Sequence, residues 1–184
     1  MQELSLNILD IAQNSIVAGA SLIEIELEAF GDEGNMLSIL IKDNGRGMNA
    51  ETLASVENPF FTSRTTRKVG LGIPLFKQAA LRTGGSFEIT SEENIGTQVK
   101  AVFDTSDIDC TPLGEVWDTI GILIQMNENI DFVYKVKNKS EEFVCDTRQL
   151  KEVMEGMPLT DIAVVQWIKE YIEENQFEVF KRRY

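Results

Sequence analysis

An apolar run that ends in an acidic residue and a glycine-rich turn constrains this chain most. Residues 39–48 read ILIKDNGRGM, which predicts a strand that delivers Asp43 to the mouth of a tight loop over residues 44–47. A carboxylate there only accepts hydrogen bonds, so it suits an exocyclic amine such as N6 of adenine, while the glycines permit close approach. The alternative is a hairpin turn with an exposed aspartate, which Asp-Asn-Gly taken alone favours.

Length and composition limit the class of protein. The 184 residues suffice for one large domain or two small ones. The formal net charge of −13 leaves no long basic stripe to replace phosphate counterions, so we expect no nucleic-acid partner. An anionic ligand must then be met by local groups and a metal ion. The chain contains no histidine, which excludes histidine-based acid–base catalysis, a serine–histidine triad and an internal phosphohistidine.

The sequence shows no pattern typical of export or membrane insertion. The opening MQELSLN lacks the basic region and long apolar core of a signal peptide, and no apolar run approaches the length of a membrane span. We therefore expect a cytoplasmic protein with no membrane partner. Cys110 and Cys145 lack the spacing of zinc ligands, so the sequence predicts small buried thiols rather than a metal site.

Apolar side chains recur with a helical period near the start of the chain. Residues 3–18 place Leu4, Ile8 and Ile11 on one stripe, which predicts a helix packed on a core. Asp10 and Asn14, four residues apart, project side by side on another face. A solvated polar pair is the ordinary explanation. The functional alternative is that Asn14 offers its amide oxygen to magnesium, while Asp10 orients or deprotonates a group one turn away.

Residues 57–69 read ENPFFTSRTTRKV and break every periodic pattern. Pro59 ends regular structure, two phenylalanines follow it, and three basic residues cluster among hydroxyls. We interpret this segment as a mobile lid that closes over a polyphosphate, with Phe60 and Phe61 anchoring its base. A surface loop with an aromatic plug would explain the phenylalanines but not the basic cluster.

A glycine motif precedes the next predicted helix. Residues 70–73 read GLGI and open a helix over residues 73–82, whose free amides and positive dipole end suit phosphate oxygens. Pro74 fits the first turn of a helix equally well in a protein that binds no ligand.

Alternating patterns predict further strands. Residues 22–27 alternate as a half-exposed strand, and residues 86–91 and 98–103 form a predicted hairpin. Thr97 opens the last strand and is placed to hydrogen-bond a base or a water near Asp43, although a threonine at a strand start is common.

The order of these motifs resembles the GHKL ATPases, the family of gyrase B, the large heat-shock chaperone, the histidine kinases and MutL. The resemblance covers residues 1–104 and implies an α+β fold, the two-layer α/β sandwich of the Bergerat type, with ATP and Mg²⁺ as ligands. The lid and the Gly-Leu-Gly motif look most like the kinases, whereas QNS and AGA at residues 13–15 and 18–20 are similar to MutL. The matching positions are Asp10, Asn14, Asp43, Gly45, Gly47, residues 58–63, residues 70–73, Gly96 and Thr97.

The resemblance also implies a role for each matching residue. Asp43 would read N6 of adenine, Met48 and Ile73 would pack against the ring, and Thr97 would help through a water. Asn14 would bind magnesium. The loop and phosphate contacts would fall to Gly45, Gly47, Phe61, Thr62, Ser63, Arg64, Gly70, Leu71 and Gly72.

Two departures from the family pattern concern catalysis. In hydrolysing members a glutamate four residues before the asparagine activates water, whereas this chain has Asp10, one methylene shorter. This shortening argues against fast hydrolysis, because a general base must lie within hydrogen-bond reach. Lys68 and Val69 stand where kinases usually have a glycine and a small residue, which predicts a stiffer lid hinge.

The remainder of the chain carries a second α+β pattern. A polar stretch at residues 104–107 is typical of a linker, so we predict an ATP-binding domain over residues 1–104 and a small α+β domain of unknown role over residues 112–176. Within the latter we predict helices over residues 113–126, 147–155 and 160–174, with strands over residues 130–137 and 141–146.

Three functions remain open from the sequence. The first is an ATP-dependent kinase acting on a separate protein, either on serine, as anti-sigma kinases do, or as a detached histidine-kinase catalytic subunit. The second is an ATP-driven conformational clamp. The third is a non-catalytic nucleotide sensor. Each implies ATP and a protein substrate or regulatory partner, and each leaves a homodimer open.

Overall fold

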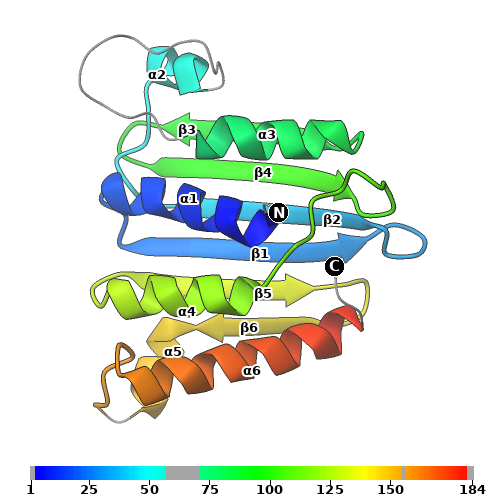
Figure 1. Cartoon of the computed structure of the whole chain (residues 1–184). Coiled ribbons are helices and arrows are strands. Elements are labelled where there is room, and N and C mark those ends of the chain that lie inside the picture. Colours follow the sequence, from blue (N-terminus) through cyan, green and yellow to red (C-terminus); the bar gives the residue numbers. More distant parts are fainter. Residues whose placement is uncertain (1–2, 57–70, 155, 182–184) are drawn as a thin grey trace.

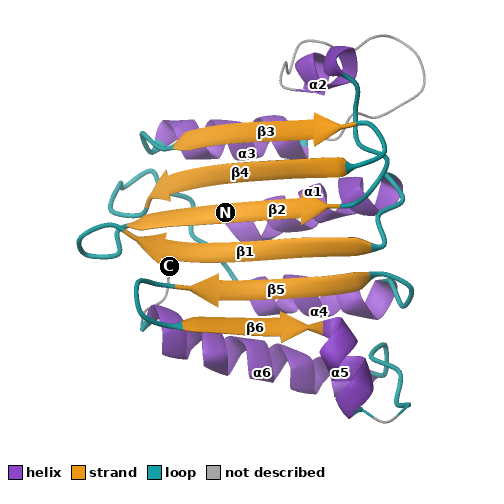
Figure 2. Cartoon of the chain, turned by 180° about the vertical axis from the view of Figure 1, so that it is seen from behind, coloured by secondary structure: helices purple, strands orange, loops and turns teal. Residues whose placement is uncertain are grey.

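The protein folds around one six-stranded sheet with helices on one face. The computed structural model describes residues 3–56, 71–154 and 156–181. The strand order is β3-β4-β2-β1-β5-β6 (Figure 1). Figure 2 shows α1, α3, α4 and α6 together behind the sheet, as the predicted two-layer α/β sandwich requires. The strands are β1 (Leu22–Phe30), β2 (Met36–Asp43), β3 (Ser86–Glu92), β4 (Gly96–Asp104), β5 (Asp131–Lys137) and β6 (Glu142–Asp146). The helices are α1 (Leu4–Val17), α2 (Ala50–Val56), α3 (Gly72–Arg82), α4 (Val116–Met126), α5 (Thr147–Val153) and α6 (Ile162–Phe180).

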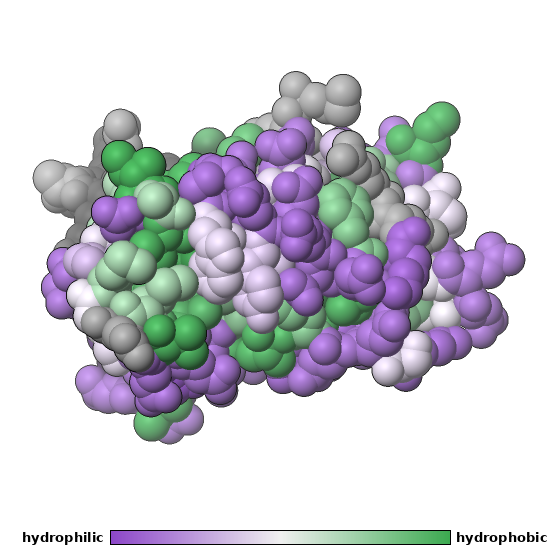
Figure 3. Space-filling view, turned by 90° about the horizontal axis from the view of Figure 1, so that it is seen from below, coloured by the Kyte–Doolittle hydropathy of each residue, from purple (hydrophilic) through white to green (hydrophobic). Residues whose placement is uncertain are grey.

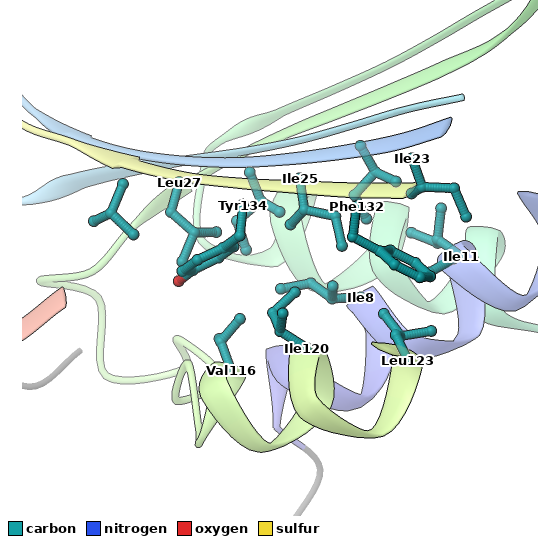
Figure 4. Packing of buried hydrophobic residues seen from close by; sticks show 14 of the residues in the cluster. Ile8, Ile11, Ile23, Ile25, Leu27, Val116, Ile120, Leu123, Phe132 and Tyr134 are labelled. Atoms are coloured by element: carbon teal, nitrogen blue, oxygen red, sulfur yellow. The ribbon is translucent and has the colours of Figure 1, made fainter. Parts of the chain in front are cut away.

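Helix α1 forms where the apolar period predicts it and packs in the centre of the helical layer. Its side chains Leu4, Ile8 and Ile11 are buried. Figure 4 shows Ile8 and Ile11 between the sheet and α4. Burying each such side chain contributes about 2 kcal/mol of hydrophobic stabilisation. The helix ends at Val17, and Gly19, two residues further on, has a φ of +78°, the left-handed conformation common after a helix C-terminus.

The strict alternation of β1 follows from its two different surroundings. Ile23, Ile25 and Leu27 point into the core, whereas the three glutamates between and beyond them lie on the face opposite the helices. On that face Lys137 Nζ approaches Glu26 Oε1 at 2.7 Å, and Lys42 Nζ approaches Glu24 Oε1 at 3.3 Å. Exposed ion pairs of this kind add little stability, so the sheet is held mainly from its inner face.

The part of the chain after β4 does not form a separate sheet. Its two strands, β5 and β6, extend the sheet formed by β1 to β4. Strand β5 lies parallel to β1, with Phe132 opposite Ile23 and Tyr134 opposite Ile25. In Figure 4 these aromatic side chains project toward Ile120 of α4 and the residues of α1. Helices α1 and α4 therefore cover one continuous core.

Backbone hydrogen bonds tie the start of the chain to the segment before α4. Leu4 N–H donates to Pro112 O at 2.9 Å, and Ser5 N–H donates to Leu113 O at 2.8 Å.

The predicted division into two domains, residues 1–104 and residues 112–176, stays a prediction. Both parts contribute strands to the same sheet, and a shared sheet does not tell whether either part folds on its own.

Helix α6 covers the far end of the sheet and runs six residues beyond the predicted end at residue 174. It buries Gln176, whose Oε1 accepts a hydrogen bond of 2.6 Å from the hydroxyl of Tyr134. Figure 3 views this side of the molecule, and its apolar surface gathers toward the end where the α5–α6 connection lies. Exposed side chains there include Val153, Met157 and Ile162.

Strand β6 places Cys145 toward the helices. Cys145 is 3% exposed, and burial, followed by the nearby Asp146 carboxylate, raises the pKa of its thiol to about 12. The prediction of a buried thiol is confirmed for Cys145. Cys110 is partly exposed, and neither cysteine is in a disulfide.

Candidate functional site

A cavity of about 580 Å³ opens between α1, the loop after β2, and the β3–β4 hairpin. It is large enough for a nucleoside, since ligand pockets usually enclose roughly 300–1,000 Å³. A second cavity of about 290 Å³ lies beside α5 and is lined by Lys151, which is already paired with Asp131 at 2.7 Å. The larger cavity is the candidate site because it contains the predicted motifs. Its lining includes Ile11, Asn14, Ser15, Asp43, Gly47, Met48, Ile73 and Thr97.

Asp43 is the polar centre of this cavity. It is the last residue of β2, and the residue is 8% exposed, so it is not the exposed hairpin aspartate of the alternative interpretation. Oδ1 accepts hydrogen bonds from Gly45 N–H at 2.8 Å and Thr97 N–H at 3.3 Å. Oδ2 accepts from the Ser15 hydroxyl at 2.6 Å. The carboxylate is therefore fixed on three sides and still lines the cavity.

Two glycines, Gly47 and Gly96, allow the loop after β2 and the β3–β4 hairpin to lie in close backbone contact beside Asp43. Gly47 has φ +61°, and a Cβ at this position would lie 1.9 Å from Glu92 O. Gly96 has φ +139°, and its Cβ would lie 1.9 Å from Asp43 O. Any side chain at either position would force the β2 loop and the hairpin apart, so these glycines position the site.

The predicted base-contact residues lie around the carboxylate. Met48, in the loop after β2, and Ile73, in α3, both line the cavity and give it apolar surface. Thr97 lies directly opposite Asp43 in the β2–β4 register. The structure thus brings together the residues for which the resemblance implies base recognition.

Asp10 and Asn14 are both exposed residues of α1. Asn14 lines the cavity, and Asp10 abuts the first residue of α3. A Cβ on Gly72 would lie 2.8 Å from Asp10 Cβ and 3.4 Å from Asp10 Oδ2. Gly72 therefore lets the N-terminus of α3 approach the Asp10 carboxylate closely. Leu71 is exposed at the N-cap of that helix.

Several predicted contacts lie outside the described residues. The lid over residues 57–69 belongs to this part of the chain, together with its predicted nucleotide contacts Phe61, Thr62, Ser63 and Arg64. Gly70 also lies outside the described residues. These assignments stay predictions.

Sequence reasoning missed Ser91 and the structural role of Asn44. Ser91 Oγ accepts from Met48 N–H at 2.9 Å and contacts Thr97 Oγ1 at 2.9 Å. Asn44 Oδ1 accepts from Ser21 N–H and Leu22 N–H, each at 2.9 Å, so it fastens the loop to β1. A serine in an alternating strand gives no sequence signal of such a role, whereas an asparagine in a turn commonly bonds backbone.

The polar groups fit a divalent cation held jointly with phosphate oxygens. Among the described residues no group of three or more His, Cys, Asp or Glu side chains could hold a metal ion alone. Magnesium commonly takes only one or two protein ligands and completes its shell with phosphates and water. The exposed amide oxygen of Asn14, with Asp10 one turn earlier, matches that requirement.

A buried carboxylate at a strand end, glycine-bordered loops and a helix N-terminus beyond them define a nucleotide-binding class of fold. The family model described as histidine kinase-, DNA gyrase B- and HSP90-like ATPase matches residues 1–107. The chain belongs to this family, which confirms the resemblance in the sequence, and ATP is the nucleotide that its domains bind.

Two of the curated proteins that this chain resembles have names that describe sensors. The chain is 33% identical over 73 residues to the sensor histidine kinase YvrG of Bacillus subtilis, covering 38% of this chain and 13% of the kinase. It is 30% identical over 104 residues to a putative sensor protein of Shewanella frigidimarina, covering 56% of this chain and 15% of the relative. The chain thus spans about a seventh of the length of these relatives.

A solved structure shares the fold. The N-terminal domain of a DNA repair protein superimposes with a TM-score of 0.52 and 16% identity, covering 78% of this chain and 52% of that chain. The superimposed part covers 78% of the chain, more than the family segment of residues 1–107, so it includes part of the C-terminal extension, the residues after 107.

The helices of the described residues lack what a membrane span needs. None of them combines the length and the apolar character required.

Proposed function

We propose that the chain binds ATP in the 580 Å³ cavity, with the adenine amino group on Asp43. The observation that carries this proposal is the environment of that carboxylate. Three protein donors hold it at the cavity wall, and about four lone-pair sites on a carboxylate leave room for one further donor. Met48 and Ile73 supply the apolar surfaces that a purine ring needs.

The triphosphate would extend toward the N-terminus of α3. Gly72 begins this 11-residue helix, and the free amides and dipole of a helix N-terminus favour phosphate oxygens. Asn14 would hold Mg²⁺ between the phosphates and α1. Gly70 and the lid, with Ser63 and Arg64, are proposed to complete the phosphate contacts.

The reaction we propose is transfer of the γ-phosphate to a separate protein, on serine or histidine. The names of the relatives support this class, since they include a sensor histidine kinase and a sporulation kinase of Bacillus subtilis. The 184 residues contain no histidine, so a phosphoacceptor histidine would lie outside them. Asp10 would act as the base, because it lies beside Gly72 where the phosphates are expected.

A nucleotide sensor without transfer is the second candidate. Asp10 is one methylene shorter than the glutamate of hydrolysing family members, and this favours slow chemistry. In that case the C-terminal extension would report occupancy, because α4 packs directly on α1, which carries Asn14. The cytoplasm supplies both ATP and Mg²⁺, and we propose that the domain works there.

ATP labelled on the γ-phosphate tests these candidates with the whole chain and proteins that co-purify with it. Transfer of label to one of those proteins supports the kinase. Steady release of phosphate together with dimerisation supports the conformational clamp. Tight binding with neither supports the sensor, and absence of ATP binding contradicts the nucleotide assignment itself.

A further inference from the structure

Ser91, Thr97 and Asp43 form a row across three neighbouring strands. Ser91 on β3 lies opposite Thr97 on β4, and Thr97 lies opposite Asp43 on β2. Thr97 and Asp43 line the cavity, whereas Ser91 lies one strand further away and contacts two lining residues, Thr97 and Met48.

The contacts of Ser91 fix the direction of its proton. A serine hydroxyl has one proton and two lone pairs. Met48 N–H can only donate, and it occupies one lone pair at 2.9 Å. Gly96 O can only accept, and at 3.0 Å it requires the proton. The remaining lone pair must then accept from the Thr97 hydroxyl at 2.9 Å.

This arrangement satisfies all three contacts at once and commits the Thr97 proton to Ser91. The Thr97 oxygen can then offer the cavity only lone pairs. The Ser15 hydroxyl has two protein acceptors in reach, Asp43 Oδ2 at 2.6 Å and Ile11 O at 3.4 Å, so its proton is committed to the protein in either case. Asp43, Ser15 and Thr97 therefore present only acceptors at this end of the cavity.

We propose that Ser91 is a positioning residue that makes this pocket reject 6-oxopurines by holding the Thr97 hydroxyl as an acceptor. The inference rests on the proposed function, since it assumes that a purine nucleotide occupies the cavity. It adds to that function a residue that does not touch the ligand.

The two purine classes differ in the groups they present at this edge. Adenine offers two N–H donors from its amino group, which suit oxygens that only accept. With the 6-position of the purine between Asp43 and Thr97, hypoxanthine would give its N1–H to Asp43 and turn its O6 toward the lone pairs of Thr97, and two acceptors repel. Without Ser91 the Thr97 proton is free to turn to O6, and the repulsion becomes a hydrogen bond.

The test compares affinities for ATP and inosine triphosphate by calorimetry, because these ligands differ only in the edge concerned. We expect wild-type protein to bind ATP at least about tenfold more tightly, the discrimination of roughly one hydrogen bond. Ser91→Ala should reduce this ratio about tenfold. Equal wild-type affinities would overturn the proposal without any variant.

A second substitution isolates the role of the Thr97 proton. In a Thr97→Val background, Ser91→Ala should leave the ratio unchanged, because no proton remains to turn. Ser91→Thr, which keeps the hydroxyl, should keep the wild-type ratio. Thr90→Ala removes a neighbouring hydroxyl from the exposed side of β3 and serves as the matched control.

The outcomes separate this proposal from the proposed function. If Ser91→Ala weakens both ligands equally, Ser91 has only a structural role and the proposal is wrong. A change of ratio that persists in Thr97→Val also overturns it. Failure of the wild-type protein to bind ATP would instead reject the nucleotide site as a whole.

Discussion

Asp43 and Thr97 are direct cross-strand partners on β2 and β4, and Thr97 N–H donates to Asp43 Oδ1 at 3.3 Å. The pairing of the two strands therefore fixes the orientation of the Asp43 carboxylate. Gly96, next to Thr97, has no side chain and lets the backbones of β2 and β4 approach each other closely. A group held by rigid strands keeps its geometry before ligand arrives, which reduces the ordering cost of binding.

Asp43→Asn should reduce the affinity for ATP about 100-fold while the fold persists. An amide has one acceptor oxygen, so its NH₂ group would face either the Ser15 hydroxyl or the backbone donors, and a charged hydrogen bond to the amine would be lost. Calorimetry measures the affinity, and circular dichroism checks the fold. Asp104→Asn, at the end of β4 but away from the cavity, is the matched control. Unchanged affinity in Asp43→Asn would refute the site.

Gly47→Ala should destabilise the protein by at least about 3 kcal/mol, measured as the free energy of unfolding in urea. The new Cβ would meet Glu92 O at 1.9 Å in addition to the cost of a positive φ. Gly19→Ala separates the two terms, because Gly19 has φ +78° but no heavy atom within 4 Å of its Cβ position. We expect it to cost only about 1 kcal/mol. Equal costs would show that the close contact is relieved elsewhere.

The sequence predicts the local elements well because their causes are local. The helical period of residues 3–18 and the alternation of residues 22–27 reflect burial on one side, and the structure shows both as α1 and β1. The carboxylate at the end of β2 was also predictable, since an apolar run, an acidic residue and glycines occur together. These patterns need no knowledge of distant partners.

The pairing of distant strands and the hydrogen bonds among hydroxyl groups could not be predicted from the sequence. The parallel pairing of β5 with β1 joins residues more than 100 positions apart, and its alternation would suit a separate small sheet equally well. Ser91 looks like any polar residue of an edge strand until its three partners are known. Such roles depend on which groups meet, and the composition of a segment does not contain that information.

Ile120→Ala should lower the free energy of unfolding by about 2–5 kcal/mol, because it opens a cavity in the core shared by α1, α4 and β5. Urea curves followed by circular dichroism and by tryptophan fluorescence should move together. Ile122→Ala, at an exposed position of the same helix, should cost less than about 1 kcal/mol. If only the fluorescence curve moves, the segment holding both tryptophans unfolds alone, as the two-domain prediction requires.

Asp10→Asn should reduce the rate of γ-phosphate transfer or release about 100-fold and leave the affinity for ATP within about twofold. The amide keeps the size of the side chain beside Gly72 but cannot take a proton. Single-turnover assays with labelled ATP measure the rate, and calorimetry measures the affinity. Asp10→Glu restores the length found in hydrolysing members and should raise phosphate release. A normal rate in Asp10→Asn would assign the base to another residue.

Cys145 should react with iodoacetamide at least about 100-fold more slowly than Cys110 in the native protein at pH 8. Only the thiolate reacts, and a pKa of about 12 leaves roughly one thiol in 10⁴ ionised at that pH. The sign is that of a burial effect: removing the thiol from water disfavours its charged form, so labelling should rise as pH increases toward the pKa. Peptide mass spectrometry measures each site. In guanidinium chloride the two rates should become similar, because both thiols then meet water, and Cys110→Ser should remove only the fast reaction. Rapid native labelling of Cys145 would show that β6 leaves the sheet readily, and the packing of the C-terminal extension on β1 would then have to be revised.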